Sequence, residues 1–94
     1  MSRFTTEIED GKKTLVWGFD RPMSEYFIQL IDNVTEEDED VVFAISNVFT
    51  LTPHPEHLDK ERWSTGELVE LLQKDFANKV PQEHIDHMLL DLPF

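Results

Sequence analysis

The chain has 94 residues, 39% of them hydrophobic, and carries 20 Asp and Glu against eight Lys and Arg, for a formal net charge of −12. This length and composition predict one small acidic globular domain, residues 1–94, and exclude a disordered chain. The absence of cysteine excludes disulfides, thiolate zinc sites and cysteine nucleophiles. The lack of a long apolar run or a secretory leader predicts a cytoplasmic protein with no membrane span.

The negative charge also limits the partners. Nucleic acids and anionic membranes repel an acidic surface, and the eight basic residues are scattered, with only Lys12 and Lys13 adjacent. Direct binding of nucleic acid or of a membrane is therefore not expected. The charge favours another protein, one with a basic surface, as the partner.

The N-terminal segment alternates apolar and polar residues, as a half-buried strand does. Phe4 and Ile8 alternate with polar residues over residues 3–9, and the alternation resumes over residues 14–19. The Asp10-Gly11 dipeptide between them accepts the positive φ angles of a tight turn. These features predict an antiparallel hairpin. Pro22 is expected to end its second strand.

Residues 25–32, EYFIQLID, fit two structures. Tyr26, Ile28 and Leu30 share one face of a strand, but the apolar residues over 23–31 also fit a helical stripe. We favour a strand, because the run is short, aromatic and rich in isoleucine. It would form a hairpin with the apolar segment that follows residues 33–40.

The longest uncharged, β-prone run is residues 41–51, VVFAISNVFTL. Because it is apolar on both faces, we expect a central strand covered on each side, or the centre of a sheet in an oligomer. Ser46 and Asn47 mark a bend or bulge, and Pro53 ends any pairing. The five acids at 36–40 predict a solvated loop, with a docking epitope or a weak cation site as alternatives.

The register changes to a helical one after a proline-containing linker, residues 53–62. Ser64 and Glu67 match a capping box, and apolar residues follow at helical spacing, so a helix is predicted over residues 65–78.

A second helix is predicted to begin at Pro81, since proline suits the first turn of a helix. Ile85, Met88 and Leu89 form its expected buried stripe. Residues 92–94 end the chain with large apolar groups, which we expect to dock onto the protein.

The usual catalytic signatures are absent from the sequence. The glycines, at 11, 18 and 66, are isolated, which excludes a phosphate-binding loop and a G-x-S-x-G nucleophile turn. Carboxylate pairs are frequent, but no pattern marks one pair as sharing a proton. We therefore expect a protein that is not an enzyme.

Histidine is the one residue type whose spacing suggests chemistry. The four copies form two pairs with the same spacing, His54-x-x-His57 and His84-x-x-His87. On a helix, His84 and His87 share a face with Asp91 one turn beyond, which makes these three a weak candidate metal site that the first pair could close. The simpler interpretation is half-exposed histidines without a metal, because H-x-x-H alone is a weak motif. No cofactor is predicted.

Candidate contacts for a partner are acids on ordered elements and large aromatic residues. In so small a protein, aromatic residues belong to the core more often than to a contact surface, and this holds for Trp17, Tyr26, Phe27 and Trp63. Those left over after helices cover one sheet face would form a patch for a partner or a second copy of the chain. The candidate residues are Glu7, Glu9, Trp17, Tyr26, Trp63, Glu67 and Glu70.

The sequence therefore predicts an α+β fold, a four-stranded antiparallel sheet, mostly a meander, followed by two C-terminal helices packed on one face. The function expected first is a small regulator or adaptor that docks an acidic, partly aromatic surface onto another protein. The alternatives are an acidic inhibitor that mimics nucleic acid to block a DNA-binding protein of the restriction or CRISPR type, and a histidine-based metal-binding protein.

Overall fold

The computed structural model describes the whole chain except residues 1, 34–39 and 93. Its four strands pair antiparallel in the order β1-β2-β3-β4, with bounds β1 Ser2–Ile8, β2 Lys13–Asp20, β3 Glu25–Asp32 and β4 Asp40–Ser46. The other elements are a 3-10 turn η1, Arg21–Met23, and the helices α1, Thr65–Asp75, and α2, Gln82–Leu89. The predicted α+β fold, a meander sheet followed by two C-terminal helices, is confirmed.

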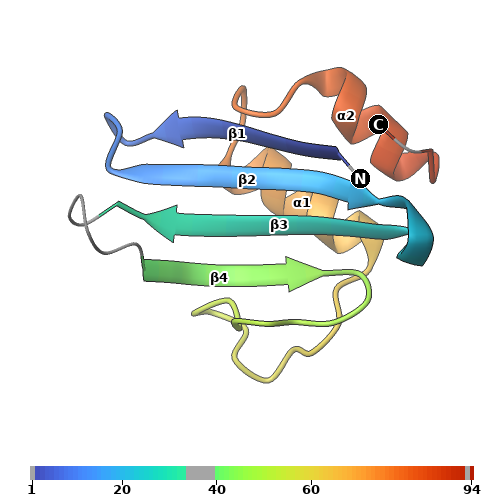
Figure 1. Cartoon of the computed structure of the whole chain (residues 1–94), viewed down its shortest axis with the longest axis horizontal. Helices are drawn as coiled ribbons and strands as arrows, with labels where there is room; N and C mark the ends of the chain where they lie inside the picture. The colour runs from blue at the N-terminus through green and yellow to red at the C-terminus, as the bar shows by residue number, and fades with distance from the viewer. Residues whose placement is uncertain (1, 34–39, 93) are drawn as a thin grey trace.

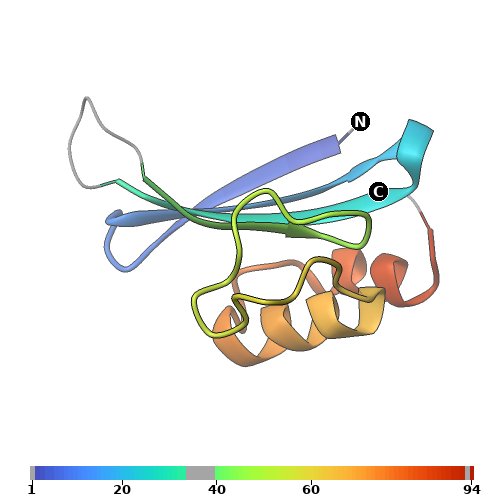
Figure 2. The ribbon, with the colours of Figure 1, turned by 90° about the horizontal axis from the view of Figure 1, so that it is seen from below.

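Both helices lie on the same side of the sheet (Figures 1 and 2). Apolar side chains alternate along each strand, so one face of every strand contributes to a shared core beneath the helices. In the described part of the chain, no helix covers the opposite face. The most deeply buried core side chains are Leu15, Tyr26, Ile28, Phe43, Ile45, Leu68, Leu72 and Met88.

The predicted N-terminal hairpin is confirmed, with a longer loop than expected. β1 and β2 pair from Ser2 opposite Phe19 to Ile8 opposite Lys13, so residues 9–12 form the connection. Three successive residues of this loop have positive φ, ending at Gly11 with φ +83°. The Gly11 N–H donates to the Ile8 carbonyl oxygen at 3.1 Å, which closes the turn.

Residues 25–32 form a strand, β3, as favoured above, and not a helix. β3 pairs with β2 on one side and with β4 on the other. The pairing with β4 has an irregularity in register between Leu30 and Ile31. Of the acidic run at 36–40, residues 36–39 lie outside the described residues. The interpretations of that run therefore stay predictions.

β4 differs from the expected central strand in place and in length. It is the last strand of the four-stranded sheet and ends at Ser46. The Ser46 hydroxyl accepts the Phe49 N–H at 2.9 Å and donates to its carbonyl oxygen at 2.7 Å, so the chain turns here. It then returns, and Leu51 donates to the Ala44 carbonyl oxygen while Thr52 accepts from the Ala44 N–H. The outer edge of β4 is thus paired locally.

The start of α1 is the predicted capping box. The Ser64 hydroxyl accepts the Glu67 N–H at 3.2 Å, and the Glu67 carboxylate accepts the Ser64 N–H at 3.0 Å. The helix ends at Asp75, three residues before the predicted end, and Asn78 has a positive φ of 68°. The chain therefore leaves α1 earlier than the apolar pattern indicates.

The second helix is also confirmed, with a correction to its buried face. Pro81 is its N-cap rather than its first helical residue. Ile85 and Met88 are buried, but Leu89 is 57% exposed and is not part of the buried stripe. The terminus docks through Phe94, whose ring stacks on that of His84 with centroids 4.8 Å apart.

Within the described residues, no helix combines the length and the apolar character that crossing a lipid bilayer requires.

Candidate functional site

The three aromatic residues predicted as partner contacts are part of the core. Trp17 is 3% exposed, Tyr26 2% and Trp63 4%, so none of them offers a ring face to a partner that docks on the folded protein. The core alternative is the correct one for these three. The Trp17 indole N–H and the Tyr26 hydroxyl each have a hydrogen-bond partner, whereas the buried Trp63 Nε1 has none among the described residues.

Trp17 is tied to α2 through a histidine. Its Nε1–H donates to Nδ1 of His84 at 3.0 Å, and the His84 ring packs against the rings of Phe4 and Phe94, with centroids 4.3 and 4.8 Å away. Burial lowers the pKa of His84, which keeps the imidazole neutral and able to accept this hydrogen bond. His84 therefore serves packing, and its Nδ1 lone pair is occupied.

Tyr26 joins β3 to the C-terminus. Its hydroxyl donates to the Leu92 carbonyl oxygen at 3.0 Å, and its backbone pairs with Asn47. Burial, with a smaller effect from the nearby charge of Asp91, raises the pKa of Tyr26. The phenol stays protonated and acts as a donor that holds the terminal residues against the sheet.

The four predicted acids come from two parts of the chain: Glu7 and Glu9 from β1 and the loop after it, and Glu67 and Glu70 from α1, where both line one hollow. Glu9 pairs with Lys13 at 3.0 Å in the β1–β2 loop region, and Glu67 is held by the capping box and by an ion pair with Lys60. Glu7 and Glu70 are exposed, on β1 and on α1 respectively. Two of the four carboxylates are thus already engaged within the protein.

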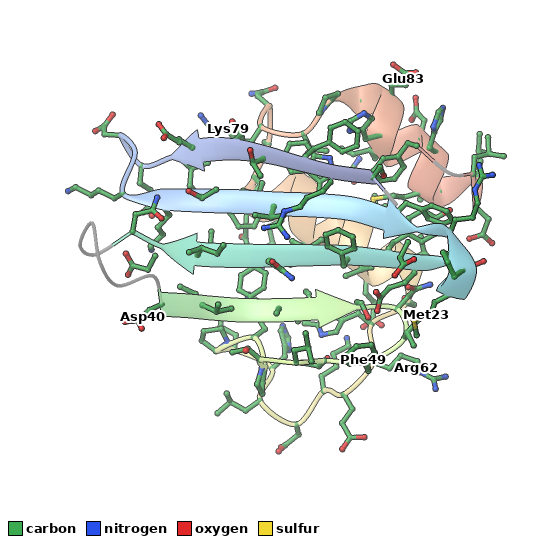
Figure 3. All side chains as sticks on the ribbon, in the orientation of Figure 1. Met23, Asp40, Phe49, Arg62, Lys79 and Glu83 are labelled. Carbon is green, nitrogen blue, oxygen red and sulfur yellow. The ribbon has the colours of Figure 1, made fainter. Side chains whose placement is uncertain are left out.

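The sheet face opposite the helices carries an apolar hollow of about 170 Å³. Phe27 and Ala44 form its floor, and Phe49 and Leu51 rise beside it from the segment after β4; Phe49 is 43% exposed and Leu51 70%. Figure 3 looks onto this face and shows Phe49 next to β4. We call the depression lined by these four residues, together with the charged residues Arg3, Asp20 and Glu25 at its rim, the open-face hollow.

The floor of the open-face hollow is shaped by Gly18. Gly18 is paired with Phe27 across β2 and β3, and a Cβ atom at position 18 would lie 2.6 Å from the Phe27 ring. The aromatic ring therefore occupies the space that a side chain would fill. Gly18 lets Phe27 lie flat across the sheet.

The rim of the hollow carries charge. Asp20 and Glu25 are direct cross-strand partners at the end of β2 and β3, and both line the hollow together with Arg3. In the described part of the chain, no ion pair joins either carboxylate to a basic side chain. Like charges placed opposite each other in a sheet repel, and with two carboxylates against one guanidinium this rim carries an excess of negative charge.

A second hollow lies between the linker and α1. The described residues contain one group of three potential metal ligands, His54, Glu56 and His57, whose donor atoms all lie within 4.8 Å of one another. Burial, with a smaller effect of His57, lowers the pKa of His54.

The predicted set of His84, His87 and Asp91 is not brought together in this way. The candidate metal site is therefore not on α2. It is formed by His54 and His57, the pair predicted only to complete the α2 site, together with Glu56.

Sequence reasoning missed Phe49 and Leu51 as surface residues, and the acids Asp20 and Glu25 beside them, and it favoured a core position for Phe27, which is only partly buried. The alternation of Phe27 with Tyr26 shows that they lie on opposite faces, but only the position of the helices decides which face stays open.

Comparison with family models, curated proteins and solved structures finds no match for this chain.

Proposed function

We propose that this protein is a cytoplasmic, non-enzymatic interaction module, a regulator or adaptor that binds a basic protein through the open-face hollow. The observation that carries the proposal is an uncovered apolar depression of Phe27, Ala44, Phe49 and Leu51 with unpaired carboxylates at its rim. An acidic, partly aromatic surface was expected from the sequence. The proposal keeps that surface and assigns it to other residues.

The apolar part of the hollow supplies a reason to bind. Leu51 is 70% exposed and Phe49 43%, and both stand next to the partly buried Phe27 ring. Removing a side chain of this size from water contributes about 1.5–3 kcal/mol when its burial is complete. A partner that inserts one apolar side chain would cover all three residues at once.

The charged rim indicates which partner fits. Asp20 and Glu25 repel each other across the strands, and a Lys or Arg side chain placed between them would remove that repulsion. Arg3 lines the same hollow and would face an acid or a carbonyl group of the partner. A protein surface with an apolar side chain flanked by basic residues meets these requirements.

Charge also ranks the alternative occupants. A second copy of the chain would bring a further net charge of −12 to the interface, which opposes self-association. Mimicry of nucleic acid would use rows of carboxylates without apolar neighbours, whereas the open-face hollow combines two carboxylates with an apolar floor. Both alternatives are outcomes that the following experiment distinguishes.

The test is affinity capture from the native host with three forms of the full chain as bait: wild type, Leu51→Ser and Leu58→Ser. Leu58 is 68% exposed and lies in the linker away from the hollow, so it matches Leu51 in residue type and exposure. We expect one basic protein to be retained by the wild type and by Leu58→Ser, and lost from Leu51→Ser. The three baits should have the same melting temperature.

Two results would contradict the proposal. Equal capture by all three baits would show that the hollow is not the contact, and capture of the chain's own second copy would make the surface a dimer interface. Recovery of a DNA-binding enzyme that is insensitive to Leu51→Ser, and lost on neutralising exposed helix acids, would favour mimicry instead.

A further inference from the structure

The turn at residues 54–57 directs two imidazoles to the same side of the backbone. The His57 N–H donates to the His54 carbonyl oxygen at 2.8 Å, with Pro55 and Glu56 as the central residues of the turn. Pro55 fixes its own φ angle, which stiffens the turn. The ring centroids of His54 and His57 lie 5.4 Å apart. The backbone thus keeps the two rings adjacent.

One of the two rings is anchored by the core and the other is adjustable. His54 is 8% exposed and lies 4.8 Å from the Phe43 ring and 5.8 Å from the Trp63 ring, measured between centroids. His57 is exposed and meets Trp63 edge-on at 5.3 Å. Glu56 is exposed as well. One donor is therefore fixed in place, and two can move toward it.

We propose that His54, Glu56 and His57 form a binding site for a divalent transition-metal ion of the zinc class. Two imidazoles and one carboxylate are a donor set that such ions accept, with the remaining position open to water. Their donor atoms lie within 4.8 Å of one another. Tetrahedral coordination at 2.0–2.1 Å places donors about 3.3 Å apart, so rotation of the exposed His57 and Glu56 side chains closes the site.

The surroundings favour a cation. A hollow of about 170 Å³ adjoins the turn, and the acids of α1 that line it are Glu67, Glu70 and Asp75. Lys60 and Lys74 also line it, and Lys60 is held by its ion pair with Glu67 and by the Trp63 ring, 4.5 Å away. With Glu56 at the turn, carboxylates outnumber the lysines around this hollow.

Binding has one identifiable cost. The Glu56 N–H donates to Nδ1 of His54 at 3.1 Å, and a neutral imidazole has a single lone pair. The ion either takes Nδ1 directly or takes Nε2 after the proton has moved to Nδ1. In both cases the Glu56 N–H loses its acceptor. The amide resonance of Glu56 is therefore a specific reporter of occupancy.

The other histidine pair does not offer the same site. Among the described residues, His84, His87 and Asp91 do not form a group of three potential ligands with donor atoms within 4.8 Å of one another, as His54, Glu56 and His57 do. His87 lies on the same helix as His84 at the same sequence spacing. This makes His87→Ala a control that removes a histidine of identical spacing without touching the proposed ligands.

The experiment uses the full chain with two probes, Zn²⁺ in isothermal titration calorimetry and Co²⁺ in absorption spectroscopy. We expect one ion per chain, tetrahedral Co²⁺ absorption bands, and a shift of the Glu56 amide resonance on adding Zn²⁺. His57→Ala and Glu56→Gln are expected to lower the affinity by at least about tenfold. Glu70→Gln, which makes the same charge change beside the same hollow, and His87→Ala should stay within about twofold.

The proposal is overturned by any of three results. These are the absence of saturable binding, an affinity that His57→Ala leaves unchanged, and an equal loss in Glu70→Gln, which would indicate general attraction to acidic groups. Because His57, Glu56, Glu70 and His87 are all exposed or half-exposed, circular dichroism should show the same fold for every variant.

Discussion

Replacing Gly18 with alanine tests how closely β1, β2 and β3 are packed around the floor of the open-face hollow. A Cβ atom on Gly18 would lie 2.1 Å from the Ser2 carbonyl oxygen and 2.6 Å from the Phe27 ring. The first contact is with backbone, so relief requires β1 to move by about 1 Å rather than a side chain to rotate. Overpacking of this kind costs about 1–3 kcal/mol, and displacement of paired backbone places Gly18→Ala near the upper end.

Gly66 provides the matched control, because the same substitution meets no obstacle there. The nearest atom to a Cβ at position 66 is the Ser64 Oγ at 4.0 Å, and Gly66 lies in the first turn of α1. Alanine stabilises such a position by about 0.4–1 kcal/mol, through helix propensity and a less flexible unfolded chain. The unfolded-state effect is common to both variants and cancels in their difference, which leaves the clash at Gly18 together with the helix propensity gained at Gly66.

The assay is thermal unfolding followed by circular dichroism, together with urea titration. For a domain of this length, 1 kcal/mol corresponds to about 4–8 °C. Gly18→Ala should therefore lower the melting temperature by roughly 10–20 °C, while Gly66→Ala raises it by a few degrees. A Gly18→Ala protein as stable as the wild type would refute the described packing of Ser2 and Phe27 against Gly18.

Three further predictions concern local energetics. Ser64→Ala should lower the free energy of unfolding by about 1 kcal/mol in urea titration, because it removes the N-cap of α1. Asp20→Asn should raise the free energy of unfolding by a few tenths of a kcal/mol, because the substitution removes the repulsion between Asp20 and Glu25, and it should also weaken partner binding. A loss of stability would contradict this account of the rim. Burial lowers the pKa of His54 and His84 below 6.5, so the unfolded chain binds more protons, and the free energy of unfolding should fall as pH drops below about 6.5. His84→Gln, whose side-chain oxygen can accept the Trp17 N–H, should reduce that pH dependence; an unchanged slope would show that His84 does not contribute.

The features predicted correctly from the sequence are those that neighbouring residues determine. Alternation of apolar and polar residues defines β1 and β2, and the Ser64 and Glu67 pair defines the start of α1 through two local hydrogen bonds. The strand at residues 25–32 was the ambiguous case. Its pairing with β2 along its whole length, rather than its own periodicity, determines the outcome.

The bend at Ser46 is predicted from the sequence, but the return of the chain along β4 is not, because no local pattern marks the pairing that it makes. The Ser46 hydroxyl turns the chain, and residues 51–52 then pair with Ala44 along the outer edge of the strand. An apolar run that looks suited to the middle of a sheet thus lies at its end. Its exposed continuation, Phe49 and Leu51, forms part of the open-face hollow.

The candidate sites show the same limit. Tyr26 and Phe27 are adjacent aromatic residues on opposite faces of β3, and only the docking of α1 and α2 makes one core and the other surface. The histidine pairs have identical spacing, but His54 and His57 lie at the ends of a turn while His84 lies against Trp17. Sequence spacing identifies such residues as candidates, and the tertiary structure assigns their roles.

The most direct test of the central claim is methyl NMR of the complex with the basic partner recovered by affinity capture. Saturation transferred from the partner should reach the methyl groups of Ala44 and Leu51 at the open-face hollow. Leu58 and Leu90, which are 68% and 67% exposed but lie elsewhere, should not respond. Strong transfer to Leu58 or Leu90, with none at Ala44 and Leu51, would contradict binding through the uncovered face of the sheet.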